Sequence, residues 1–133
     1  MASTLESYPR RDATFRLRKG GVTVMDRYQG RVVTLDTFSS EIWLRIDGLT
    51  TVRDIAADLA HHLRQPPAQL EPRVVAMTGV LLSEGLIFLS AKPGPHPYHL
   101  AVATDRQDPD ETAASKRACG WVDHYRSSPA GDV

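Results

Sequence analysis

The stretch from Arg31 to Leu86 constrains the fold most, because one strand pattern is followed there by three closely spaced helix patterns. Asp36 is placed to cap the first helix, since a carboxylate accepts hydrogen bonds from the free backbone N–H groups of a first turn. Gly48 and Gly85 are placed to end the first and the third helix with a positive φ angle. The expected helices start at Asp36, at Thr50 or Thr51, and at Ala68 or Leu70, and the third one ends at Glu84.

Three strand patterns precede these helices. Residues 15–18 alternate apolar and basic side chains, which is the period of a half-buried strand. Residues 22–25 predict a second strand, and a hairpin loop that ends in Gly30 leads to a third over residues 31–35. The predicted fold class is α+β and winged helix-turn-helix-like, with a three-stranded antiparallel sheet followed by three helices.

The composition divides the chain into three parts. Residues 1–13 are polar and predict a flexible N-terminus. Residues 14–90 hold the sheet and the helices, and close with an apolar run that predicts a terminal strand or wing over residues 86–89. Residues 91–133 begin with a proline-rich stretch and predict a mostly disordered tail. One short helix between about Asp110 and Tyr125 would dock onto the domain through Trp121 and Tyr125.

The charge balance argues against a nucleic-acid partner. Lys plus Arg is 16 and Asp plus Glu is 16 among 133 residues, so the formal net charge is +0, without the basic footprint of a DNA or RNA binder. Cys119 is the one cysteine, so no internal disulfide forms. No apolar run approaches the roughly 20 residues that span a membrane, and no signal peptide is apparent. We expect a cytoplasmic protein.

The third helix and the third strand suggest a binding surface. Two adjacent apolar stripes make the apolar arc of this helix wider than the roughly 100° that one core contact requires. Either the helix is the central, most buried one, or one stripe faces the core and another lines a groove. A strand at a sheet edge is a template for an incoming strand. We predict that strand 31–35 and helix 70–84 enclose a groove that holds an extended peptide. The stripes are Leu70, Val74, Met77 and Leu81, with Val75, Thr78 and Leu82 beside them.

A strand pair followed by helices also occurs in winged-helix transcription regulators, which are the main alternative. A recognition helix is normally basic on its exposed face. Helix 70–84 instead carries Arg73 against Glu71 and Glu84, a net charge of 1 − 2 = −1. The strands are more basic, and this basic run either steers an acidic peptide segment or is a solvated sheet face.

The sequence offers no catalytic or metal-binding pattern. Asp58 and His62 share a helix face, but two ligands make only half of a tetrahedral zinc site. No phosphate-binding glycine loop and no catalytic triad signature is present, and Trp43 is most simply a core anchor. We therefore predict no enzyme activity, no metal and no cofactor.

The order and spacing of several short motifs resemble the PqqD-like proteins, which are peptide-recognition elements of ribosomally made, modified peptide pathways. The resemblance covers residues 14–90 and rests on Leu35-Asp36, Ile42-Trp43, Asp47-Gly48, Thr51-Val52-Arg53-Asp54-Ile55 and Leu81-Leu82-Ser83-Glu84-Gly85-Leu86. It implies a non-catalytic adaptor or chaperone that binds the leader segment of a precursor peptide as an added strand. It also implies a partner enzyme, such as a radical SAM protein or a leader peptidase.

The resemblance further implies which residues bind the peptide. Asp36 stands where the family has asparagine, and either residue caps a helix well. A third reading is an enzyme subunit whose tail completes the active site of another protein. The implied binding residues are Arg31, Val32, Val33, Thr34 and Leu35 on the strand, and Arg73, Val74, Met77, Val80 and Leu81 on the facing helix.

Overall fold

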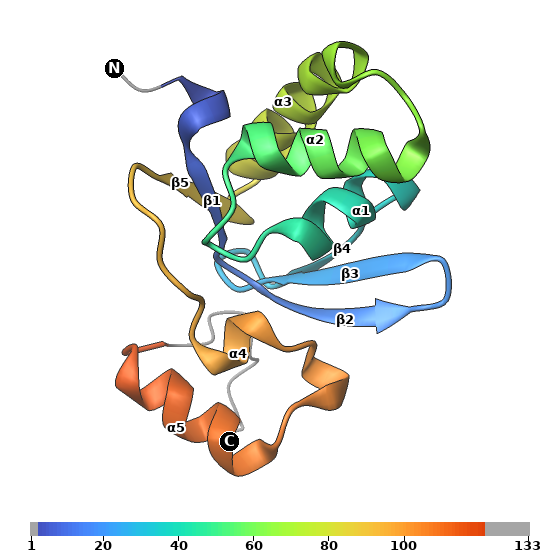
Figure 1. The fold of residues 1–133 in the computed structure, drawn as a ribbon. Coiled ribbons are helices and arrows are strands. Elements are labelled where there is room, and N and C mark those ends of the chain that lie inside the picture. Colours follow the sequence, from blue (N-terminus) through green and yellow to red (C-terminus); the bar gives the residue numbers. More distant parts are fainter. Residues whose placement is uncertain (1–2, 122–133) are drawn as a thin grey trace.

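A three-stranded antiparallel sheet and three helices form the centre of the structure, as predicted (Figure 1). The computed structural model describes residues 3–121. The strands follow one another in the sheet in the order β2-β3-β4, and the α+β class is confirmed; the winged-helix-like label stays a prediction. The strands are β2 (Thr14–Arg18), β3 (Gly21–Asp26) and β4 (Arg31–Thr34), and the helices are α1 (Thr37–Arg45), α2 (Val52–Leu63) and α3 (Pro67–Ser83).

The caps of the helices largely follow the prediction. The Asp36 carboxylate accepts a hydrogen bond of 2.8 Å from the backbone N–H of Ser39, and the Thr51 hydroxyl caps α2 in the same way. Gly85 follows α3 with a φ of 77°, and the N–H of Leu86 reaches back to the carbonyl of Leu81 at 3.1 Å. This is the Schellman arrangement, which satisfies the last carbonyls of a helix.

The first helix ends earlier than predicted. It stops at Arg45, and Gly48, with its φ of 79°, lies in the loop that follows. The Asp47 carboxylate accepts from the N–H of Leu49 at 2.8 Å and from the hydroxyl of Thr50 at 3.1 Å. Such local side-chain bonds compete with the helical ones, so Asp47 starts a turn in place of another helical turn.

The core lies between the sheet and the helices. Trp43 is 0% exposed and is a core anchor, as predicted. Its ring meets the Phe15 ring edge-on, with 5.8 Å between the centroids. The other fully buried side chains of the core come from the sheet and from the α1, α2 and α3 segments, and include Val22, Val24, Ile42, Ile46, Ile55, Leu59 and Leu70.

The N-terminal segment does not match the flexible terminus predicted for residues 1–13. A short 3-10 turn, η1 (Thr4–Glu6), leads into strand β1 (Tyr8–Arg11), which pairs antiparallel with β5 (Ile87–Ser90). The terminal strand expected near residues 86–89 is therefore confirmed as β5. Sequence reasoning missed β1 because its partner lies about 80 residues away and because Arg11, a basic residue, is buried with 5% exposure.

The C-terminal extension, residues 91–121, is mostly ordered, in contrast to the predicted tail. It forms α4 (Tyr98–Ala101), the 3-10 turn η2 (Thr104–Arg106) and α5 (Pro109–Ala118) below the sheet in Figure 1. The expected short helix is thus present as α5, while Tyr125 lies outside the described residues. The guanidinium of Arg11 explains the order, because it donates to the carbonyls of Leu100 at 3.1 Å and Ala101 at 3.2 Å.

Two further contacts fix the extension. The N–H of Gly94 donates to the carbonyl of Gly48 at 2.8 Å, and a side chain on Gly48 would meet the Gly94 carbonyl oxygen at 2.1 Å. On the opposite side of the sheet from β4, the N–H of Leu17 on β2 donates to the Asp105 carboxylate at 3.4 Å. The extension therefore runs along the outer side of β2.

Candidate functional site

Strand β4 is an edge strand. Among residues 3–121 it pairs only with β3, and the N–H of Leu35 donates to the carbonyl of Val22 at 2.9 Å. Because hydrogen-bonded and non-hydrogen-bonded pairs alternate along antiparallel strands, the backbone groups of Val32 and Thr34 point away from β3. Within the described part of the chain, no other strand pairs with that side of β4. Its polar groups are therefore available to an incoming strand.

A groove of about 290 Å³ lies between this edge and helix α3. Its bottom is formed by buried Leu35, Leu81 and Leu86. Val80 projects from α3 with 49% exposure, which is high for a valine on a helix packed against a core. An apolar hollow beside an unpaired strand edge offers side-chain pockets next to main-chain hydrogen bonds. The groove residues are Val33, Thr34, Leu35, Asp36, Ser39, Met77, Val80, Leu81, Glu84 and Leu86.

Six of the ten predicted binding residues line the groove, and the other four do not. Two of those outside the groove still border it: Val32 is 58% exposed on the edge strand, and Arg31 lies at the start of β4. The other two are turned elsewhere, since Val74 is fully buried in the core and the Arg73 guanidinium lies over the Phe38 ring, 4.4 Å from its centroid. The predicted residues that line the groove are Val33, Thr34, Leu35, Met77, Val80 and Leu81.

Four groove residues were not among the predicted ones: Asp36, Ser39, Glu84 and Leu86. Asp36 and Glu84 were recognised only as helix ends. The hydroxyl of Ser39 contacts the Met77 sulfur at 3.1 Å, which ties α1 to α3 beside the groove. The residues directly before α1 and directly after α3 both line the groove. The predicted ends of these two helices were therefore the sequence signal that could have pointed to Asp36 and Glu84.

Charges at the two ends of β4 are held in place by hydrogen bonds. Arg31 bridges two carboxylates, with 2.8 Å to Asp26 and 2.7 Å to Glu84. Burial raises the pKa of Asp26, but hydrogen bonds from Arg31 and from two backbone N–H groups outweigh it and leave the pKa below its ordinary value. The backbone N–H of Ser39 likewise lowers the pKa of Asp36. Both carboxylates are therefore charged at neutral pH.

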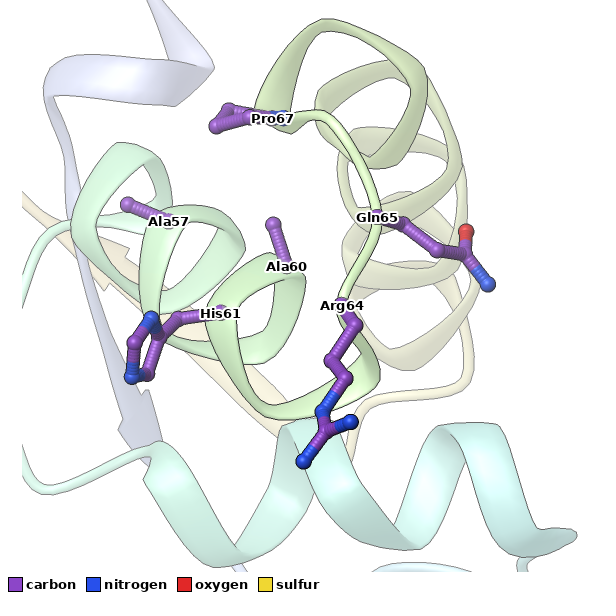
Figure 2. A pocket seen from close by; sticks show the side chains of 6 residues that line it. All are labelled: Ala57, Ala60, His61, Arg64, Gln65 and Pro67. Carbon is purple, nitrogen blue, oxygen red and sulfur yellow. The ribbon is translucent and has the colours of Figure 1, made fainter.

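A larger hollow, of about 490 Å³, lies where α2 meets α3. Figure 2 shows it lined by Ala57, Ala60 and Pro67, with the side chains of Arg64 and Gln65 extending outward. None of the residues that line it lies on a strand, and its polar side chains are exposed rather than buried. Specific binding sites usually combine an apolar surface with a convergent set of polar groups, so the smaller groove beside β4 is the candidate site.

Two other features are absent from the described part of the chain. Residues 3–121 contain no group of three His, Cys, Asp or Glu side chains arranged to hold a metal ion. None of the helices described has the length and apolar character needed to cross a bilayer.

One family model matches the chain, over residues 16–87, and its description is coenzyme PQQ synthesis protein D (PqqD). The matched segment runs from β2 to the start of β5, so it includes both β4 and α3. Strand β1 and the C-terminal extension lie outside it. Comparisons with curated proteins and with solved structures gave no significant match.

Proposed function

Since the chain belongs to the PqqD family, we propose that it binds the leader segment of a ribosomally made precursor peptide and presents it to a modifying enzyme. Membership supports the coarser statement that the protein is a peptide-binding partner in natural-product biosynthesis. The proposal adds the mode of binding, which is strand addition between β4 and α3. It also adds a tailoring enzyme, such as a radical SAM protein or a leader peptidase, as the partner, and the cytoplasm as the place of action.

One observation carries this proposal: the unpaired edge of β4 lies directly beside an apolar groove. In strand addition, main-chain hydrogen bonds contribute affinity, and pockets for alternate side chains contribute specificity. Val32 and Thr34 would supply the backbone groups, and Val33, Met77 and Val80 would contact the peptide side chains that point toward α3. The protein itself would supply no catalytic group.

Helix α3 supports this arrangement through its two faces. One stripe, including Leu70, Val74 and Leu81, is buried against the core, while Val80 stays half exposed. The side chain of Val80 is therefore available to contact a peptide in the groove. No observation on the described residues favours the DNA-binding alternative, since the exposed side of α3 is apolar rather than basic.

The test is a proline on the edge strand. Val32→Pro removes an outward N–H and adds a ring at the edge, but it spares the bonds to β3, because edge strands tolerate proline where the N–H faces solvent. Each hydrogen bond lost contributes about 0.5–1.5 kcal/mol, and the ring also blocks close approach. We expect at least about tenfold weaker binding, which corresponds to about 1.4 kcal/mol.

The measurement is fluorescence polarisation with a labelled leader segment of a precursor peptide encoded beside the gene. Val32→Ala is the matched control, because it shortens the same side chain and keeps the N–H, and it should bind within about threefold of the wild type. Circular dichroism checks that both variants are folded. Equal affinity of the proline variant and its control would contradict strand addition at β4.

A further inference from the structure

The charged groups of the groove are both carboxylates. Asp36 and Glu84 line it, and no lysine or arginine does. Asp36 lies two residues beyond the end of β4 at Thr34, whereas Glu84 pairs with Arg31 at the start of β4, so the two carboxylates lie toward opposite ends of this strand. Of the basic strand residues considered for steering an acidic peptide, Arg16 and Arg18 are on β2, the other outer strand of the sheet. Arg31 lies at the start of β4, but its guanidinium is already paired with Asp26 and Glu84.

The end near Glu84 carries an excess negative charge. Arg31 is a single cation between two carboxylates, Asp26 and Glu84, so the three side chains sum to (+1) + (−1) + (−1) = −1. Asp26 is 2% exposed on its side chain, whereas Glu84 is 42% exposed. The accessible part of this charge is therefore the Glu84 carboxylate, on the side that faces the groove.

The end near Asp36 is more nearly balanced. The Asp36 carboxylate accepts a hydrogen bond from the N–H of Ser39. The guanidinium of Arg73, on α3, lies over the ring of Phe38, which is two residues from Asp36 in the sequence. The two ends thus differ in net charge. A bound strand that carries a cation would be favoured at the Glu84 end over the Asp36 end.

We propose that the groove selects a peptide segment with alternating apolar residues and a lysine or arginine at the position that passes Glu84. The inference rests on the proposed function, because it assigns the substrate class of the same groove. A cation there completes a second ion pair at Glu84, while an acidic residue is repelled. Because the pair is partly exposed, its contribution is modest and screened by salt. It sets the register of the peptide rather than most of its affinity.

The experiment exchanges the charges of peptide and protein. In the labelled leader segment used for Val32→Pro, each position is replaced in turn by lysine and by glutamate, and binding is measured by fluorescence polarisation at low salt. At one position near one end of the binding segment, wild-type protein should prefer lysine over glutamate by about five- to tenfold. Glu84→Lys should invert this preference at the same position, and raising the salt concentration should shrink it.

Glu71→Lys is the matched control. It makes the same charge change on the same helix, where Glu71 faces Arg53 rather than the groove, and the lysine preference should survive it. Glu84→Lys gives up the ion pair with Arg31, but position 84 caps the C-terminus of α3, where cations are favourable. Circular dichroism establishes that both variants are folded.

The outcomes separate the two proposals. A preference below twofold at every position of the wild type, or an inversion by Glu71→Lys as well, overturns the charge selection and leaves strand addition intact. Absence of binding by every peptide, or binding that Val32→Pro leaves unchanged, overturns both. An inversion by Glu84→Lys alone supports the assignment.

Discussion

Arg11 offers the sharpest test of how the C-terminal extension is held. Its guanidinium donates to the carbonyls of Trp43, Leu100 and Ala101 at 2.9, 3.1 and 3.2 Å. It also lies over the Phe15 ring at 4.5 Å from the centroid. We expect Arg11→Met, which keeps much of the length and none of the donors, to destabilise the fold by about 3 kcal/mol.

This magnitude follows from two opposing contributions. Hydrogen bonds from a charged group contribute about 1.5–3 kcal/mol each, so the three bonds together contribute roughly 4.5–9 kcal/mol. Burial lowers the pKa of Arg11 well below its ordinary value, to about 10, against the opposing effect of Asp47. At about 1.36 kcal/mol for each pKa unit, that burial costs about 3 kcal/mol, which methionine avoids. The difference is about 1–6 kcal/mol, with about 3 near its middle.

The assay is urea unfolding followed by circular dichroism. Arg16→Met is the control, because Arg16 is exposed on β2 and surface changes usually stay within about 0.5 kcal/mol. Hydrogen exchange of α4 and α5 should rise in Arg11→Met before the rest of the molecule is affected. A loss below 1 kcal/mol, with unchanged exchange in these helices, would refute the view that Arg11 anchors the extension.

Two further predictions concern the groove and acid stability. Val80→Glu should weaken binding of the leader segment at least about tenfold, since a carboxylate in an apolar contact is costly. Leu82→Glu, on the same helix and also exposed but outside the groove, should not, and equal effects would count against the assigned groove. His96 accepts the Arg11 backbone N–H at 2.7 Å. Burial, helped by nearby arginines, lowers the His96 pKa from 6.5 to about 4. Because the folded state resists protonation, stability should be greatest above about pH 6.5 and fall as the pH drops toward 4. His96→Gln keeps an acceptor that does not titrate, so its urea midpoint should fall less over this range; parallel curves would refute the assignment.

Local signals explain why the centre of the fold was predictable. Asp36 and Thr51 precede apolar periodic segments, and each caps a helix where predicted. Gly85 ends α3 because the chain needs a positive φ there. Such features depend on a few neighbouring residues, so a single sequence contains them.

The remaining elements depend on contacts between distant residues. Arg11 has partners 32 to 90 positions away, and nothing near it in the sequence indicates burial. The same limit applies to the site: periodicity placed Val74 and Met77 on one stripe, but only packing shows that Val74 faces the core and Met77 the groove. The edge position of β4 likewise depends on the pairing of the whole sheet.

The course of the C-terminal extension along β2 bears on how many strands the sheet of one molecule can take up. Asp105 accepts the Leu17 N–H, so the outer side of β2 is covered there, whereas the outer side of β4 is open among the described residues. We therefore expect the sheet to take up one added strand per molecule. We expect this to disfavour the joining of copies sheet to sheet into a continuous ribbon, because each copy would have to meet the next through the covered side of β2. If β4 takes up a peptide as proposed, the C-terminal extension thus favours one bound peptide per molecule.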